Sequence, residues 1–287
     1  MSMMAMETFI EILWEAVCRG EILFLGEKAA GRRWIEPPVG GTVLALAPHP
    51  DDPDAVAVTL RVFARAGCRV SYAVTGGATG GVTDQYARGW AKAAGKSSKD
   101  LETCKLELRR AEQLASAEKS GIVDGEVVFL EGGTEDDFGD LTETPGNASL
   151  LGELLKNEAP DIVALPHGED TNVGHAALYN LFRALASKLA AGRNRPLLAL
   201  YIHDPKTTAI NEQLVVPFDG EAARWKASLL RCHDSQQQRN IEQRGYGLDE
   251  RILKLNRKIQ TDLQNRVLEP WKDECLYAES FQIELFG

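Results

Sequence analysis

The feature that most constrains the fold is an alternation of short apolar runs with longer helical patterns. Five runs are almost continuously apolar, which is typical of strands buried on both faces of a sheet. They cover residues 42–47, 69–75, 126–130, 161–165 and 196–202. Strand–helix–strand alternation predicts a parallel sheet with right-handed crossovers, in which ligands bind beyond the carboxyl ends of the strands. We therefore predict an α/β fold with a mostly parallel sheet, and expect functional residues directly after the strands.

Helical patterns separate these strands and continue after them. Asp54 is placed to cap a helix that ends before Gly67. Further helices are predicted at residues 100–120, 149–158, 175–190, 221–232 and 249–267, and loops at 92–99 and 239–248. We expect residues 1–40 to form a helical extension packed outside the sheet, and residues 41–287 to form a single domain.

Composition limits the classes of partner. The 287-residue chain is 44% hydrophobic and carries a net charge of -10, with no sustained Lys/Arg cluster. This acidic balance argues against nucleic acid and anionic membrane surfaces as partners. No apolar run approaches the roughly 20 residues that a membrane-spanning helix needs.

Cysteine usage and the N-terminus indicate the compartment. The five cysteines are odd in number, widely spaced and without a CxxC pair, so neither a disulfide framework nor a thiolate zinc site is expected. The N-terminus lacks the basic region of a signal peptide. We expect a reducing, cytoplasmic location, and the sequence is compatible with a homo-oligomer.

One imidazole and three carboxylates follow the first predicted strand. Residues 48–54 read PHPDDPD. Acids crowded at a strand end repel one another, and a bound cation relieves that repulsion. The spacing of His49 and Asp52 lets both side chains reach one ion across a tight turn.

A second group follows the fourth predicted strand, where residues 166–175 read PHGEDTNVGH. Neutral imidazole is the commonest nitrogen ligand of zinc, and three protein ligands plus a water define a catalytic zinc site. We predict one divalent ion per chain, zinc or another divalent metal, bound by His49, Asp52 and His175. His167 either serves this site or only packs and caps locally.

Three further residues are candidates for the same site. Zinc lowers the pKa of a bound water to about 7, so a carboxylate beside the metal can accept the proton. Asp51 is the best candidate for this general base, and Asp170 could orient an imidazole. Gly77 belongs to the segment TGGATGG after the second strand, which either approaches a ligand closely or forms a flexible turn.

Together these segments resemble the LmbE-like, or PIG-L, de-N-acetylase superfamily. The APHPDDPD segment at residues 47–54 is similar to its AHPDDE-type motif. Weaker similarities come after it in order: a T-x-G-x-x-G segment at 75–80, an R-x-x-E pair at Arg109 and Glu112, a K-x-x-A-L-x-x-H-x-S-Q-like segment at 226–236, and Y-A-E-x-F at 277–281.

The resemblance implies a Rossmann-like three-layer sandwich with C-terminal helical elements. It also implies a zinc-dependent hydrolase that removes an N-acetyl or other N-acyl group from an N-acetylglucosamine-type substrate, cutting a linear non-peptide C–N bond. The metal ligands carried over are His49, Asp52 and His175. Asp51 would be the general base and then protonate the leaving amine, and Arg109 would position the substrate. The implied partner is a small glycoside or another N-acylated molecule.

The chain departs from the family pattern before the second metal histidine. The family usually shows H-x-D-H there, and its first histidine stabilises the oxyanion. Here Asn172 takes that position; its amide can donate a hydrogen bond to an oxyanion but cannot protonate anything. His167 or His203 could replace the imidazole. The alternative function is therefore a sugar- or small-molecule-binding protein with weakened catalysis.

Overall fold

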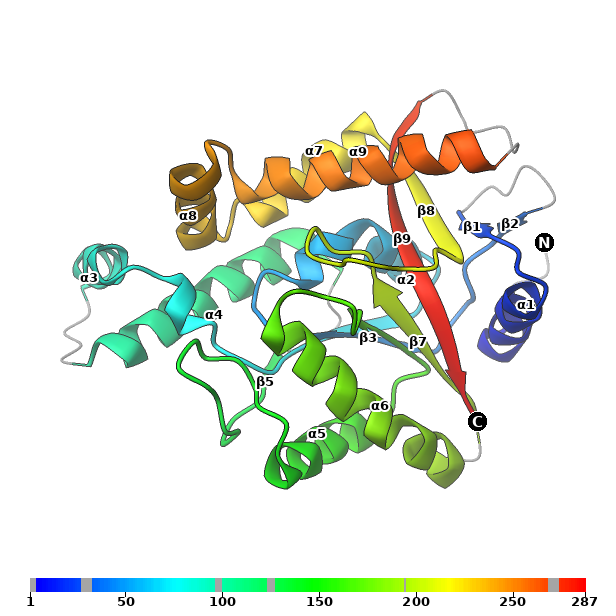
Figure 1. The fold of residues 1–287 in the computed structure, drawn as a ribbon, viewed down its shortest axis with the longest axis horizontal. Helices are drawn as coiled ribbons and strands as arrows, with labels where there is room; N and C mark the ends of the chain where they lie inside the picture. The colour runs from blue at the N-terminus through cyan, green and yellow to red at the C-terminus, as the bar shows by residue number, and fades with distance from the viewer. Residues whose placement is uncertain (1–3, 27–32, 96–99, 123–126, 194, 268–273) are drawn as a thin grey trace.

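The computed structural model describes residues 4–26, 33–95, 100–122, 127–193, 195–267 and 274–287. Nine strands in these ranges form one sheet with helices on both faces (Figure 1). Their order is β2-β1-β8-β9-β7-β6-β3-β4-β5. Every pairing is parallel except the two that β9 makes with β7 and β8. The predicted α/β fold with a mostly parallel sheet is confirmed.

The strands are β1 (Leu23–Leu25), β2 (Trp34–Ile35), β3 (Thr42–Ala47), β4 (Arg69–Val74), β5 (Val128–Phe129), β6 (Ile162–Pro166), β7 (Leu197–Ile202), β8 (Leu214–Asp219) and β9 (Cys275–Phe286). The block β5-β4-β3-β6-β7 has the order 3-2-1-4-5 of the first five strands of a Rossmann fold. Sequence analysis missed β8 and β9. In β9 two buried polar residues, Glu279 and Ser280, interrupt the apolar run that marks the other strands.

The helices are α1 (Met6–Cys18), α2 (Ala57–Arg65), α3 (Asp84–Ala93), α4 (Leu101–Ser120), α5 (Pro145–Glu158), α6 (Val173–Arg193), α7 (Gly220–Leu230), α8 (Asp234–Arg244) and α9 (Leu248–Arg266), with short 3-10 turns at Pro53–Val56 and Thr79–Gly81. Among the described residues, no helix combines the length and apolarity that crossing a membrane requires.

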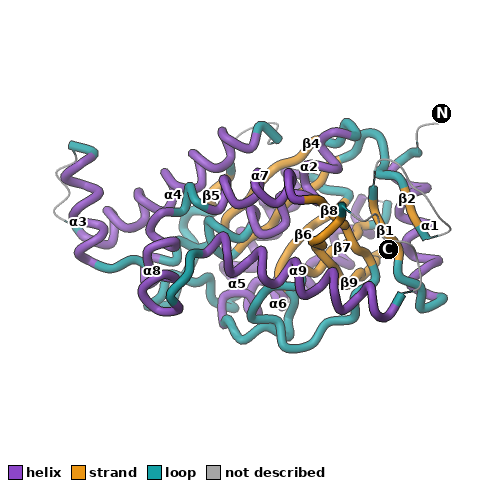
Figure 2. The backbone as a smooth tube through the Cα atoms, turned by 90° about the horizontal axis from the view of Figure 1, so that it is seen from above, coloured by secondary structure: helices purple, strands orange, loops and turns teal. Residues whose placement is uncertain are grey.

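The core has two main layers, one on each face of the sheet (Figure 2). Alternate residues of a strand point to opposite faces. Val43 and Ala45 of β3 pack in the layer that contains residues of α1, α2 and α7, whereas Leu44 and Leu46 pack in the layer that contains α5 and α6. Both faces of β3 are therefore buried, and polar side chains can gather only beyond its end.

Several local predictions need correction. Asp54 does not cap α2; it is fully buried in the 3-10 turn, where its carboxylate binds Ser116 and His233. The predicted loop 239–248 is helical up to Arg244, because Gln and Arg favour a helix until Gly245, whose φ of +79° ends it. Sequence analysis also missed α3.

The N-terminal segment contributes more than the expected helix. Besides α1, its strands β1 and β2 extend the sheet beyond β8. The division at residue 40 stays a prediction. Residues 96–99 of the predicted loop 92–99 and residue 126 of the predicted strand 126–130 lie outside the described ranges.

Candidate metal centre and active site

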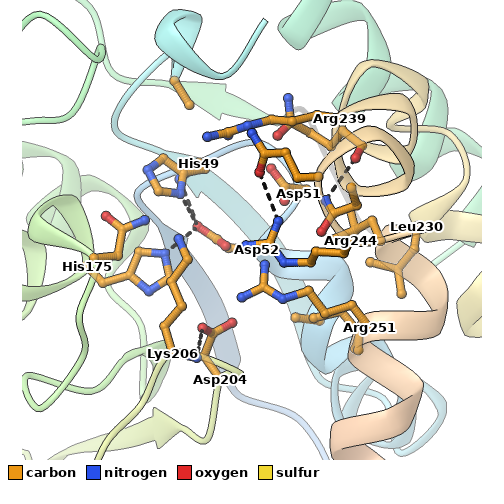
Figure 3. Close-up of a pocket in the computed structure, with 18 of the residues that line it drawn as sticks. His49, Asp51, Asp52, His175, Asp204, Lys206, Leu230, Arg239, Arg244 and Arg251 are labelled. Carbon is orange, nitrogen blue, oxygen red and sulfur yellow. Dashed lines mark hydrogen bonds and ion pairs between the residues drawn. The ribbon is translucent and has the colours of Figure 1, made fainter. Parts of the chain in front are cut away.

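The predicted metal ligands meet at the point where the strand order reverses. His49 follows β3, and His175 lies in the first turn of α6, directly after β6. These neighbouring parallel strands are joined to strands on opposite sides of the pair, and such a reversal opens a crevice at the carboxyl edge of the sheet. An open pocket of about 750 Å³ lies there, lined by His49, Asp52 and His175 (Figure 3).

The donor atoms of these three residues have the spacing of ligands to one ion. Oδ2 of Asp52 lies 3.2 Å from Nδ1 of His49 and 3.5 Å from Nε2 of His175. Ligands about 2.0–2.1 Å from a tetrahedral zinc lie roughly 3.3 Å apart. Nε2 of His175 is also buried without a hydrogen-bond partner in the described part of the chain. The three residues therefore fit a divalent cation.

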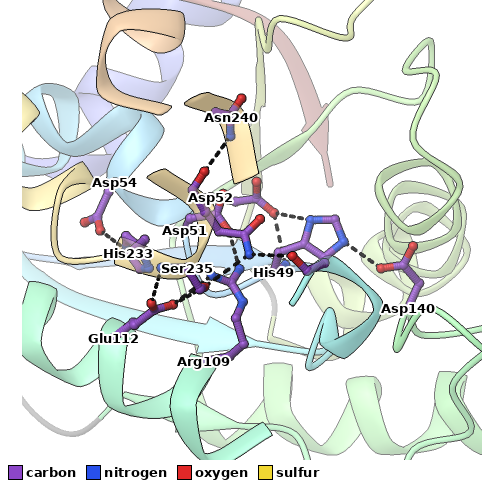
Figure 4. A network of polar contacts seen from close by, with 12 residues as sticks. His49, Asp51, Asp52, Asp54, Arg109, Glu112, Asp140, His233, Ser235 and Asn240 are labelled. Atoms are coloured by element: carbon purple, nitrogen blue, oxygen red, sulfur yellow. Dashed lines mark hydrogen bonds and ion pairs between the residues drawn. The ribbon is translucent and has the colours of Figure 1, made fainter. Parts of the chain in front are cut away.

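A carboxylate backs each imidazole on the side away from this cluster. Oδ1 of Asp140 lies 2.6 Å from Nε2 of His49 (Figure 4), and Oδ2 of Asp170 lies 3.0 Å from Nδ1 of His175. Such contacts fix the orientation and tautomer of a metal-binding imidazole. Burial opposes protonation of His49, but Asp52 and Asp140 raise its pKa to about 10. The cluster thus strongly favours positive charge.

Gly174 explains how Asp140 reaches His49. A Cβ atom at position 174 would lie only 2.5 Å from the Cγ atom of Asp140. Because real Cβ atoms do not approach a carboxylate so closely, any side chain at this position would displace Asp140. The contact between Asp140 and His49 therefore requires a glycine directly before His175.

Asp51 is held by a chain of buried polar groups (Figure 4). Nη2 of Arg109 donates to Asp51, and Nη1 donates to Glu112 at 3.2 Å. Glu112 also accepts hydrogen bonds from the backbone N–H and the hydroxyl of Ser235, at 2.6 and 2.8 Å. Burial would raise the pKa of Asp51, but the charge of Arg109 holds that pKa well below its usual range. Asp51 is therefore an ionised carboxylate of fixed orientation beside Asp52.

Comparison with known proteins agrees with this geometry. The model of the family described as GlcNAc-PI de-N-acetylase, PIG-L, matches residues 44–186, which contain both strand-end segments. The chain belongs to the PIG-L (LmbE-like) superfamily. No curated protein matches it.

Solved structures share the fold of this PIG-L chain. N,N'-diacetylchitobiose deacetylase from Pyrococcus horikoshii is 18% identical, with a TM-score of 0.62 over 85% of this chain and 84% of that one. A triple mutant of a deacetylase of the teicoplanin biosynthetic pathway has 16% identity and a TM-score of 0.57, over 85% of this chain and 98% of that one. The zinc-inhibited form of teicoplanin deacetylase has 16% identity and a TM-score of 0.53 over the same shares.

Arg109 lines the pocket, but its side chain is buried and its guanidinium pairs with Asp51 and Glu112. These pairs let Arg109 position the carboxylate of Asp51. The role in positioning the substrate, which the resemblance implied, stays a prediction. The R-x-x-E pair and the segment containing Ser235, which are weak signals singly, thus belong to one hydrogen-bonded chain.

The other predicted site residues divide into two groups. Asn172 lines the pocket, although its side-chain oxygen accepts a hydrogen bond from the N–H of Gly174 at 3.0 Å. His167, His203 and Gly77 are not among the pocket residues. The ring of His167 packs against Tyr179 and Tyr201, and His203 lies 3.3 Å from the hydroxyl of Ser280. Asn172 is therefore better placed than either histidine to meet an oxyanion.

Sequence analysis missed two parts of the site. Asp140 lies in the loop between β5 and α5, not directly after the strand, so the rule that placed His49 and Asp52 did not single it out. The second part consists of basic side chains that line the pocket: Lys206, Arg239, Arg244 and Arg251. Three of them come from α8 and the N-terminal part of α9, and no local pattern marked them.

Proposed function

We propose that this protein is a metal-dependent N-deacetylase that hydrolyses the acetamide, or another N-acyl group, of an amino-sugar-type substrate. The observation that carries the proposal is the His49–Asp52–His175 cluster beside the ionised carboxylate of Asp51, which pairs with Arg109 and does not belong to the cluster. The neighbouring structures are a deacetylase of diacetylchitobiose and a deacetylase of the teicoplanin pathway, which supports deacetylation as the class of reaction. One neighbouring structure is a zinc-inhibited form of its deacetylase, which supports a divalent ion at such a site; we propose zinc, with another divalent ion as the alternative.

The proposed chemistry divides between the metal and the chain. A bound divalent ion would acidify a water molecule and polarise the substrate carbonyl. Asp51 accepts a proton as the water oxygen bonds to the carbonyl carbon, and returns it to the nitrogen as the C–N bond breaks. The amide of Asn172 is the candidate donor to the oxyanion, and Arg109 keeps Asp51 aimed at the reacting atoms.

Two observations favour the alternative, a binding protein with weakened catalysis. Arg109 keeps the pKa of Asp51 low, and a carboxylate of low pKa is a weaker base. Asn172 also cannot deliver a proton. The two functions differ in one outcome: the alternative predicts binding of N-acetylglucosaminides without release of free amine.

A panel assay tests the proposal. The purified protein, loaded with zinc to about one ion per chain, is incubated with N-acetylglucosaminides that differ in the attached group, and free amine is measured. Release of amine that stops when the metal is removed supports a deacetylase. A zinc-loaded protein that binds members of the panel and releases no amine supports the alternative, and a protein that cannot be loaded with metal contradicts both the metal site and the mechanism.

Location and assembly remain expectations. All five cysteines are free, which agrees with the reducing, cytoplasmic compartment that we propose. A homo-oligomer stays compatible with the chain.

A further inference from the structure

The pocket is positively charged in a strongly acidic protein. Its lining contains five Lys or Arg residues and three Asp residues, whereas the whole chain has a net charge of -10. Arg109 is already engaged by acidic partners. The remaining four, Lys206, Arg239, Arg244 and Arg251, make no ion pair with an acid in the described ranges. A divalent ion in the cluster would increase this excess of positive charge.

The arginines of α8 and α9 line one part of the pocket. Figure 3 shows Arg244 and Arg251 on the side away from His49 and His175, whereas Arg239 extends across the pocket, with its guanidinium 5.5 Å from the ring of Phe138. Burial lowers the pKa of Arg239, the negative charge of Asp51 opposes this, and the positive charges of Arg244 and Arg251 lower that pKa further. Like charges held this close repel one another, so they raise the energy of the protein unless an anion lies among them. We call Arg239, Arg244 and Arg251 the arginine wall.

Contacts between α8, α9 and the turn before α8 hold the backbone that carries the arginine wall in place. The side chain of Gln237 on α8 accepts a hydrogen bond from the N–H of Leu248, the first residue of α9, at 2.8 Å. A Cβ at Gly247 would lie 2.2 Å from that same oxygen, so the turn between the helices closes tightly around Gln237. Arg231 of the preceding turn pairs with Asp249 at 2.6 Å. The arginines therefore extend from a framework that need not rearrange to bind a ligand.

We propose that the substrate carries an anionic group, a phosphate or a carboxylate, which the arginine wall binds while its N-acyl group lies at the metal cluster. Guanidinium groups match both anions with paired hydrogen bonds. The proposal rests on the proposed function for the place of the acyl group, but the anion site itself can be tested without catalysis. Arg239 and Arg251 are half-buried, so water screens their charges less than those of fully exposed arginines.

Binding of deacylated sugars provides that test. Glucosamine 1-phosphate, muramic acid and methyl glucosaminide carry a phosphate, a carboxylate and no anion, respectively, and none has an acetamide to hydrolyse. Calorimetric titration of the zinc-loaded protein should show at least about tenfold tighter binding of one or both anionic sugars than of the neutral one. The comparison of the two anions identifies the group. The titrations are repeated on metal-free protein, because an anion can also bind the metal.

Two variants locate the effect. Arg239→Gln combined with Arg251→Gln should reduce the affinity for the anionic sugar to that for the neutral one. Arg257→Gln is the matched control, because it removes the same charge from α9 at an exposed position that does not line the pocket. Three results would overturn the proposal. The first is equal binding of charged and neutral sugars. The others are a preference for anionic sugars that disappears when the metal is removed, or one that survives the double substitution. If no acetylated sugar is hydrolysed but the preference and its loss are observed, the anion site stands and the deacetylase function fails.

Discussion

The two sides of the pocket differ in origin. The side with His49, Asp52 and His175 is built from segments that directly follow β3 and β6, so the backbone of the sheet holds it. The arginine wall belongs to α8 and α9, which lie about 60 residues or more further along the chain than His175. In our proposal the first side is the hydrolytic centre, and the second carries charge that would select a ligand. The comparison suggests that chemistry and specificity occupy separate parts of this fold, and four substitutions test that separation.

The largest effect is expected from Asp52→Asn. Asp52 faces both histidines, and an amide in its place removes the negative charge that a divalent ion needs. We expect zinc content to fall well below one per chain and amine release to fall by about a thousandfold or more, since metal activation is worth several kcal/mol. Metal analysis and the panel assay measure both. A variant that keeps one zinc per chain would remove Asp52 from the ligand set.

Asp51→Asn should show whether Asp51 acts as the general base or as a metal ligand. The amide keeps the shape of the side chain but cannot accept the proton, so amine release should fall by about a hundredfold or more. Zinc content should stay near one per chain, because Asp51 binds Arg109 and is not part of the cluster. Full activity in this variant would show that another group is the base. Loss of zinc would show that Asp51 is a ligand.

Asp140→Asn should lower the metal affinity of the same side of the pocket indirectly, through His49. The change replaces the carboxylate 2.6 Å from Nε2 of His49 and so loosens control of the imidazole. Groups that orient metal-binding histidines typically affect metal affinity or activity by about 10–100-fold. Competition with a chelator measures the zinc affinity. Asp137→Asn, an exposed change in the same loop, is the control and should behave like the unchanged protein.

Arg251→Gln should affect only the second side. For an anionic acetylated sugar we expect KM to rise by about tenfold with kcat little changed, because the contact is equally strong in the ground and transition states. For a neutral sugar neither parameter should move, and Arg257→Gln should leave both substrates unaffected. A fall in kcat for both sugars would mean that the arginine wall takes part in the chemistry, and the two sides would then not be separate.

Much of the first side could be predicted from local sequence patterns. In a parallel sheet the carboxyl ends of neighbouring strands meet at one edge, so residues after β3 and β6 had to lie near each other once the strands were recognised. Asp170 lies beside His175, as expected of a residue that orients an imidazole. The roles of these residues remain predictions, but their proximity is a consequence of strand order.

Other features depended on contacts between distant segments. Asp54 looks like a helix cap in the sequence, yet it is paired with His233, which is 179 positions away. The resemblance implied that Arg109 positions the substrate, and the structure adds that its guanidinium pairs with Asp51 and Glu112. In each case a partner from another segment engages the side chain.

The sequence by itself determined the strand–helix alternation, the edge of the sheet that carries the site, and the group of His49, Asp52 and His175. These depend on the apolar period and on the residues directly after each strand, which are local properties. Only the tertiary structure decided that Asp140 backs His49, that Arg109 holds Asp51, and that three arginines line the same pocket as the histidines. The physical reason is that a buried or crowded charge is stabilised by whichever partner packing brings to it, and residue spacing along the chain does not specify that partner.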